Sequence, residues 1–124
     1  MLLTNFEMDS KLIVSFILAG QPRLREILHS ERLQDIAQRI FHHVELRLLS
    51  ADESLDYMRH RCTIAGMKTF PFDEKSARAI FEITRGNMRA IDHLALKSLE
   101  MATKKNIGGV DEGMVLTARK SLWL

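Results

Sequence analysis

Three polar side chains lie where a folded chain could contact a ligand. Gln21 directly follows an apolar segment, at the carboxyl end of a predicted strand, where open α/β sheets bind their ligands. Arg39 lies at the end of a predicted helix, and Arg89 lies in the first turn of a later one. Two of them also have a purely structural interpretation, because Gln21 fits a Gly-Gln-Pro turn and Arg39 complements the negative end of a helix dipole.

Arg89 differs from the other two because its local position is unfavourable. It follows Gly86 and Asn87, which favour a helix start, so its charge opposes the positive end of the helix dipole. The start of a helix is a natural place for an anion, and a cation beside it would serve that anion. This local conflict favours a functional role for Arg89.

The chain carries no phosphate-binding loop of the Gly-x-x-x-x-Gly-Lys-Ser/Thr type, whose backbone amides and lysine surround phosphates. The nearest segment, residues 66–69 (GMKT), has Met67 where the lysine belongs and Arg61 where the first glycine belongs. No acidic residue closes an apolar strand to hold magnesium. We therefore expect that this chain by itself binds no Mg-ATP and has no cofactor of its own.

The histidines and the cysteine do not have the spacing of a metal site. His42 and His43 are adjacent and would point to opposite faces of a strand, and His60 and Cys62 diverge on a helix. We expect no metal ion. A single cysteine also excludes an internal disulfide and favours a reducing, cytoplasmic setting.

The first part of the chain has the pattern of a strand, a helix and a second strand. Residues 12–19 are almost all apolar, as in a buried parallel strand, and in residues 43–48 apolar and polar side chains alternate. Between them, apolar residues recur at helical spacing: Leu24, Ile27, Leu28, Leu33, Ile36, Ala37 and Ile40. This pattern predicts a strand-helix-strand unit with most of its sheet absent.

From Ser50 onward the pattern predicts four amphipathic helices. Ser50 with Glu53 forms a capping box, and Asp73, Asn87 and Asp111 are suitable N-caps for the three helices that follow. Gly66 and Gly86 are suitable stops. The expected fold is therefore mainly α, with a two-strand remnant of a parallel α/β core in residues 1–49 and a four-helix bundle in residues 50–124.

Composition agrees with one modest soluble domain. The chain has 124 residues, 46% of them hydrophobic, and a formal net charge of +2. The nearly balanced charge argues against a tail that coats a polyanion. The longest apolar run is too short to span a bilayer, so no membrane insertion is expected.

Several short segments together resemble the second half of an AAA+ ATPase. They are residues 3–7 (LTNFE), 17–22 (ILAGQP), 37–40 (AQRI), 57–61 (YMRHR) with 65–66 (AG), and 86–90 (GNMRA). In combination they are similar to the branch that includes the general secretion pathway protein ExeA and ATPases encoded beside transposases. The resemblance extends over nearly the whole chain.

The resemblance implies a role for each of the three polar residues. Gln21 would be sensor 1, which positions the attacking water at the γ-phosphate. Arg39 would be an arginine finger that reaches into the site of a neighbouring subunit. Arg89 would be sensor 2, which contacts the γ-phosphate from the helical lid. The full-length parent would use ATP with Mg²⁺ and form homo-oligomers, with a secretion-complex protein, a transposase or DNA as a further partner.

A complete member of that family has its phosphate loop and magnesium-binding strand upstream, so the resemblance implies that this chain is a truncated fragment. An alternative is a helical module that binds protein or DNA without enzymatic activity. Its basic face would comprise Arg78, Arg85, Lys97, Lys104, Lys105, Arg119 and Lys120. Acidic residues such as Glu82, Asp92 and Glu100 interleave with that face, which favours an ordinary solvated surface.

Overall fold

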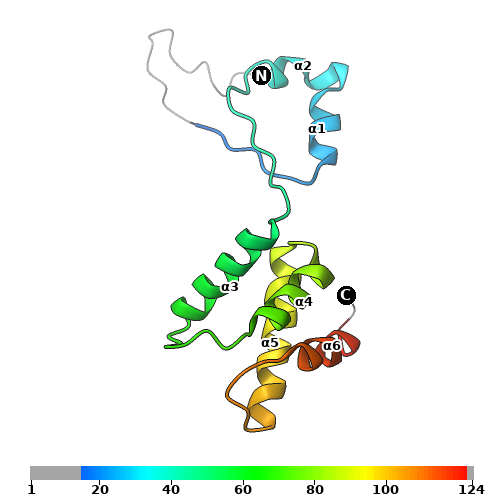
Figure 1. Ribbon diagram of the computed structural model, residues 1–124. Coiled ribbons are helices and arrows are strands. Elements are labelled where there is room, and N and C mark those ends of the chain that lie inside the picture. Colours follow the sequence, from blue (N-terminus) through cyan, green and yellow to red (C-terminus); the bar gives the residue numbers. More distant parts are fainter. Residues whose placement is uncertain (1–14, 123–124) are drawn as a thin grey trace. The chain divides into compact units, whose positions relative to one another are not determined.

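The computed structural model describes residues 15–122 and is mainly helical (Figure 1). It divides into two compact units, and the division falls between Glu45 and Leu46. We describe each unit by itself. In the described residues, no helix is both long enough and apolar enough to cross a lipid bilayer.

The described residues of the first unit include short helical segments. They are α1 at Arg23–Leu28, a 3₁₀ turn at Glu31–Leu33 and α2 at Gln34–Ala37. The predicted helix is therefore present but broken. The break follows from Ser30, whose amide and hydroxyl both bond to the Ile27 carbonyl, at 3.1 and 2.6 Å, and so end α1.

The two predicted strands are wrong for the residues that the structure describes. Residues 15–19 and 43–48 have no strand conformation, while Leu12, Ile13 and Val14 lie outside the described residues. The apolar side chains of these segments are exposed, with Ile17 at 93% and Leu46 at 88%. A strand requires a neighbouring strand to bond its amides and carbonyls, and the described residues supply none.

The described residues of the second unit form four helices, as the sequence predicts. They are α3 at Ala51–Ile64, α4 at Glu74–Thr84, α5 at Met88–Lys104 and α6 at Glu112–Lys120. Their starts confirm the predicted caps. Ser50 and Glu53 form the capping box, and the carboxylate or amide oxygens of Asp73, Asn87 and Asp111 each accept a bond from the backbone amide three residues later.

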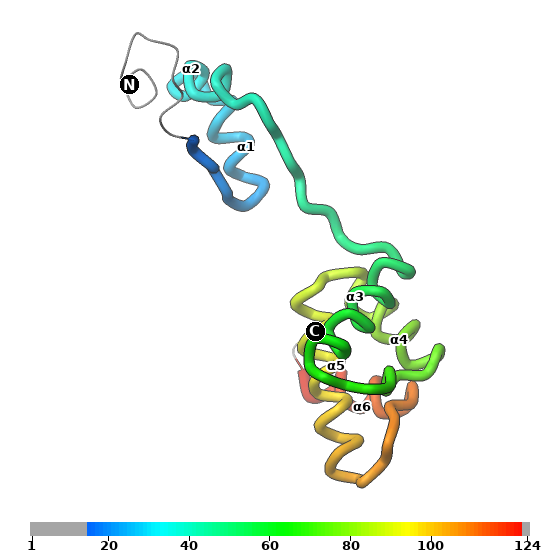
Figure 2. Tube along the Cα trace, turned by 90° about the vertical axis from the view of Figure 1, so that its left-hand side faces the viewer, coloured from blue at the N-terminus to red at the C-terminus, as the bar shows by residue number. Residues whose placement is uncertain are grey.

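Helices α4 and α5 contact each other and both remaining helices of this unit (Figures 1 and 2). Their contact surface is the core, in which Ile80, Ile91, Leu94 and Val115 are fully buried. The core also contains Met58, Ala77, Ala102, Met114 and Ala118. Every buried side-chain polar atom among the described residues has a hydrogen-bond partner.

The loops that join the helices are also fixed. The loop before α4 and the loop before α6 meet in a parallel bridge between Phe72 and Val110. The amide of Val110 donates a 2.7 Å bond to the carbonyl of Pro71. This bridge places the capped starts of α4 and α6 next to each other.

Candidate functional site

Arg89 lies in the first turn of α5, where the sequence predicts it. The side chain of Asn87 caps this helix through a 3.1 Å bond from the amide of Ala90, and the first turn of α5 contains no acidic residue. Arg89 is exposed, and no hydrogen bond or ion pair joins its side chain to another residue within 15–122. An arginine at the positive end of a helix and open to solvent is suited to an anionic group.

The turn before Arg89 is held by a close backbone contact with the segment that enters the second unit. The amide of Leu49 donates a 3.0 Å bond to the carbonyl of Gly86. Gly86 has a φ of +79°, and a Cβ atom on it would come within 2.0 Å of the Leu49 carbonyl oxygen. Arg85 precedes it with a φ of 52°. Only glycine satisfies both the conformation and the space at position 86.

A polar network joins α3 to α5 near Arg89. The hydroxyl of Tyr57 donates a 2.9 Å bond to Oδ2 of Asp92, and Nε of Arg61 lies 3.4 Å from Oδ1 of the same carboxylate. Partial burial, together with the Asp92 carboxylate, raises the pKa of Tyr57. One carboxylate therefore binds two side chains of α3 and fixes the second turn of α5 against that helix.

The entry to α3 is stabilised by a charged pair. The guanidinium of Arg47 donates two bonds to the carboxylate of Glu53, at 2.7 and 2.6 Å, and the amide of Ser50 donates a third at 2.8 Å. These bonds, with Arg47 as the largest contributor, lower the pKa of Glu53 to about 2. These bonds hold Arg47 and Ser50 against Glu53 in the first turn of α3.

Gln21 and Arg39 belong to the first unit. Gln21 is exposed, and its carbonyl accepts a 2.7 Å bond from the amide of Leu24 at the start of α1. Arg39 is also exposed and lies two residues after α2. Arg89 lies in the other unit, so the convergence of these three residues on one phosphate group stays a prediction.

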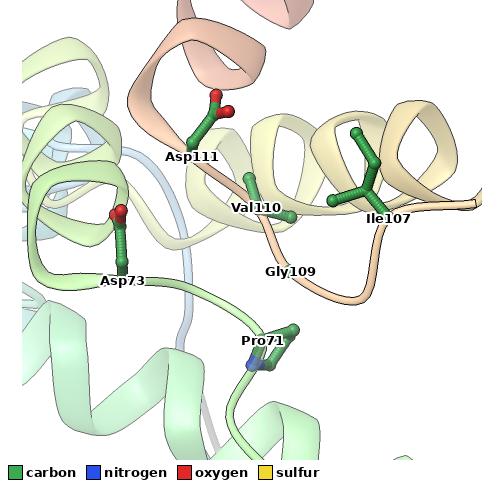
Figure 3. A pocket seen from close by; sticks show the side chains of 6 residues that line it. All are labelled: Pro71, Asp73, Ile107, Gly109, Val110 and Asp111. Carbon is green, nitrogen blue, oxygen red and sulfur yellow. The ribbon is translucent and has the colours of Figure 1, made fainter. Parts of the chain in front are cut away.

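A shallow groove lies beside the bridge between the two loops (Figure 3). It has a volume of about 260 Å³ and is lined by Pro71, Asp73, Ile107, Gly109, Val110 and Asp111. Both of its carboxylates already cap helices, because Asp73 accepts from Ser76 at 2.7 Å and Asp111 from Met114 at 2.8 Å. The hydrogen bond from the Ser76 amide lowers the pKa of Asp73. Asp73 and Asp111 therefore have a structural role as helix caps.

Metal ligands do not gather in the part of the chain that the structure describes. Between residues 15 and 122, no three side chains of histidine, cysteine, aspartate or glutamate come together in a group that could hold an ion. Burial raises the pKa of the Cys62 thiol, which disfavours the reactive thiolate form.

Comparison with known proteins finds a relative of this chain. Over 98 residues, which are 79% of this chain, the sequence is 33% identical to the general secretion pathway protein A of Aeromonas hydrophila. The two proteins are related in sequence. No family model matches the chain, and no solved structure matches it.

The match to general secretion pathway protein A covers most of this chain but only a small part of the relative. The aligned region is 18% of the length of the Aeromonas protein. The relationship therefore supports the predicted resemblance to the ExeA-like branch in general terms. The roles of Gln21, Arg39 and Arg89 remain predictions within it.

The sequence indicates Gly86 as a helix stop, but it does not predict the bond of Tyr57 with Asp92 or the contact of Gly86 with Leu49. Tyr57 and Arg61 are four residues apart and therefore share one face of α3, which is the signal that could have paired them with an acid. Nothing local identifies Asp92 as that acid. The contact between Gly86 and Leu49 has no sequence signal beyond the glycine itself.

Proposed function

We propose that this chain supplies sensor and lid elements to an ATP-dependent switch related to general secretion pathway protein A. The observation that carries the proposal is Arg89, exposed in the acid-free first turn of α5, within a chain that is 33% identical to that relative over 98 residues. In the assembled protein Arg89 contacts the γ-phosphate of its own subunit. Residues 50–124 act as the lid and residues 1–49 as the end of the nucleotide-binding core.

Gln21 and Arg39 have complementary roles in this proposal. Gln21 orients the water that attacks the γ-phosphate. Arg39 extends into the nucleotide site of the neighbouring subunit in a homo-oligomer and stabilises the charge that develops during transfer. The exposure of both side chains in the first unit supports these roles, since each must reach a group outside its own unit.

The described residues suit a phosphate group of ATP but not its magnesium ion. Arg89 and the start of α5 suit a terminal phosphate, because cationic and backbone N–H donors lie together there. The magnesium ion does not fit, since the described residues contain no group of ligands for it and both carboxylates of the groove cap helices. No step that depends on magnesium is assigned to this chain.

The structure does not favour the alternative of a basic DNA-binding face. Arg78 pairs with Glu82 at 3.1 Å, and Lys97 pairs with Glu100 at 3.1 Å. These pairs neutralise part of the expected basic surface. A secretion complex, which the name of the relative suggests, is the partner that we propose, and a cytoplasmic location is proposed with it.

A chimera tests the proposal. The matched segment of the Aeromonas hydrophila protein is replaced by this chain, and ATP hydrolysis is measured against the unmodified relative. We expect activity in the chimera and a loss of at least about 100-fold for Arg39→Ala or Arg89→Ala. Arg78→Ala, which removes an exposed arginine of α4, is the matched control and should retain activity.

The pattern of complementation separates the two arginines. Arg39 acts on the neighbouring subunit, so mixing Arg39→Ala chimera with Arg89→Ala chimera should restore part of the activity in mixed oligomers. An active chimera that tolerates both substitutions would contradict the proposal.

A further inference from the structure

Asp92 contacts Arg61 at the Nε atom of the guanidinium. Its Oδ1 atom faces Nε of Arg61 at 3.4 Å, and its Oδ2 atom accepts the hydroxyl of Tyr57 at 2.9 Å. The guanidinium of arginine is a planar fork with a second edge formed by its two terminal nitrogens. The Arg61 side chain is 56% exposed, so these terminal donors remain accessible to a ligand.

Arg89 is close to this network on α5. It precedes Asp92 by three residues, and residues three apart on a helix are neighbours on its surface. The hydrogen bond from Leu49 to Gly86 fixes the start of α5, and the Tyr57–Asp92 bond fixes its second turn against α3. Arg61 of α3 is thus paired with the carboxylate that follows Arg89 by three residues on α5.

We infer that Arg61 is a second phosphate-binding residue beside Arg89, with Asp92 as the positioning residue, and that their ligand is the terminal phosphates of a nucleotide. This inference rests on the proposed function, because it extends the site of Arg89. Two guanidinium forks from different helices can each bind oxygens of adjacent phosphate groups. A nucleotide bound there would bridge α3 and α5.

A purely structural role for Arg61 makes a different prediction. If Arg61 only tied α3 to α5, its substitution would lower the stability of the helical unit and leave anion binding unchanged. Arg61→Lys separates charge from shape, since lysine keeps the charge but lacks the fork. Asp92→Asn gives a second test. If only the local charge matters, removing the negative charge of Asp92 should strengthen phosphate binding. If Asp92 positions Arg61, the same substitution should weaken phosphate binding.

Titration of the full 124-residue chain tests the inference. ATP, ADP and inorganic tripolyphosphate are added without metal at low ionic strength, and binding is followed by NMR shifts of the backbone and of the arginine side chains. We expect millimolar binding of ATP and tripolyphosphate, weaker binding of ADP, and shifts at Arg61 and Arg89. Arg61→Gln and Arg89→Gln should each weaken ATP binding by about fivefold or more, and Arg61→Lys by an intermediate factor.

Arg78→Gln is the matched control, because Arg78 is an exposed arginine paired with Glu82 on α4. It should change binding by less than about twofold. Thermal unfolding of each variant confirms that the unit is folded during the titration. A short DNA duplex is titrated in parallel, and shifts at Arg61 and Arg89 as strong as those with ATP would overturn the assignment to a nucleotide.

Two other outcomes also overturn the inference. They are the absence of ATP binding by the wild-type chain, and wild-type affinity in Arg61→Gln. The proposed function is tested separately by hydrolysis in the chimera, where Arg39 and Arg89 are the required residues. If Arg61→Gln binds ATP normally while Arg89→Ala abolishes hydrolysis in the chimera, only the role of Arg61 is lost.

Discussion

The hydroxyl of Tyr57 in α3 donates a 2.9 Å hydrogen bond to Oδ2 of Asp92 in α5, and this bond connects positions 35 residues apart. The same carboxylate faces Arg61, so two side chains of α3 depend on a single side chain of α5. The network and the close contact at Gly86 both belong to the helical unit. The network links α5, which carries Arg89, to the helix that follows the first unit.

Tyr57→Phe should destabilise the helical unit by about 1 kcal/mol, because it removes one hydrogen bond from a half-buried pair. The expected fall in melting temperature is about 5 °C for a unit of this size. Urea denaturation of Tyr57→Phe, Asp92→Asn and the double variant measures the coupling between the two residues. Additive effects of the two substitutions would show that the bond contributes nothing to stability.

Gly86→Ala should destabilise the same unit by about 3 kcal/mol or more. A positive φ costs a non-glycine residue about 1 kcal/mol or more, and the added Cβ must displace the Leu49 backbone. Two other glycines are matched controls. Gly66 has a φ of +81° and nothing within 4 Å, so Gly66→Ala should show only the cost of the backbone conformation. Gly108→Ala, with open space and no positive φ, should be nearly neutral.

Chemical denaturation of these three variants gives the comparison directly. From the most to the least stable variant, the expected order is Gly108→Ala, Gly66→Ala and Gly86→Ala. Equal stabilities of Gly66→Ala and Gly86→Ala would show that the contact with Leu49 adds nothing to the cost of the backbone.

The Glu53 carboxylate should make the start of α3 sensitive to acid. Its pKa is lowered from 4.5 to about 2 in the folded chain, chiefly by the hydrogen bond from Arg47. A lowered pKa stabilises the folded state fully above pH 4.5, and this contribution is lost as the pH falls through 4.5 towards 2. An NMR titration of the Glu53 carboxyl carbon measures the pKa.

Removal of either partner should weaken that acid dependence. In Arg47→Gln the Glu53 pKa should rise towards 4.5, although the Ser50 amide keeps part of the shift. In Glu53→Gln the stability of the helical unit should depend less on pH between 2 and 5 than it does in the wild type. An unchanged profile would mean that the pair does not persist in solution.

The isolated chain should not hydrolyse ATP. Its sequence has no phosphate loop, and residues 15–122 contain no group of ligands for magnesium. Phosphate release by the purified chain should equal the buffer rate, and Arg89→Ala should give the same value. Turnover that follows the chain through purification and disappears in Arg89→Ala would contradict this expectation.

The starts of the four helices in the second unit were predictable from the sequence alone. Each is set by a cap whose hydrogen bond spans three residues, as with Ser50 and Glu53 or Asp73 and Ser76. The apolar stripe that buries Ile80, Ile91 and Leu94 is likewise a local periodic pattern. Short-range bonds and helical periodicity are both contained in a few consecutive residues.

Local patterns could not decide whether the two predicted strands form. The alternation of residues 43–48 indicates a preference for a strand, but a strand forms only where another one bonds to it, and the described residues offer none. A segment's sequence indicates its preference for the strand conformation but does not show whether a neighbouring strand is available to pair with it.

The place of Arg89 in the first turn of α5 was predictable from the sequence, because the helix start is a local property. Its surroundings were decided only by the tertiary structure. The contact of Gly86 with Leu49 and the sharing of Asp92 by Tyr57 and Arg61 join residues that are distant along the chain. Such contacts depend on how α3 packs against α5, and packing is determined by the whole core at once.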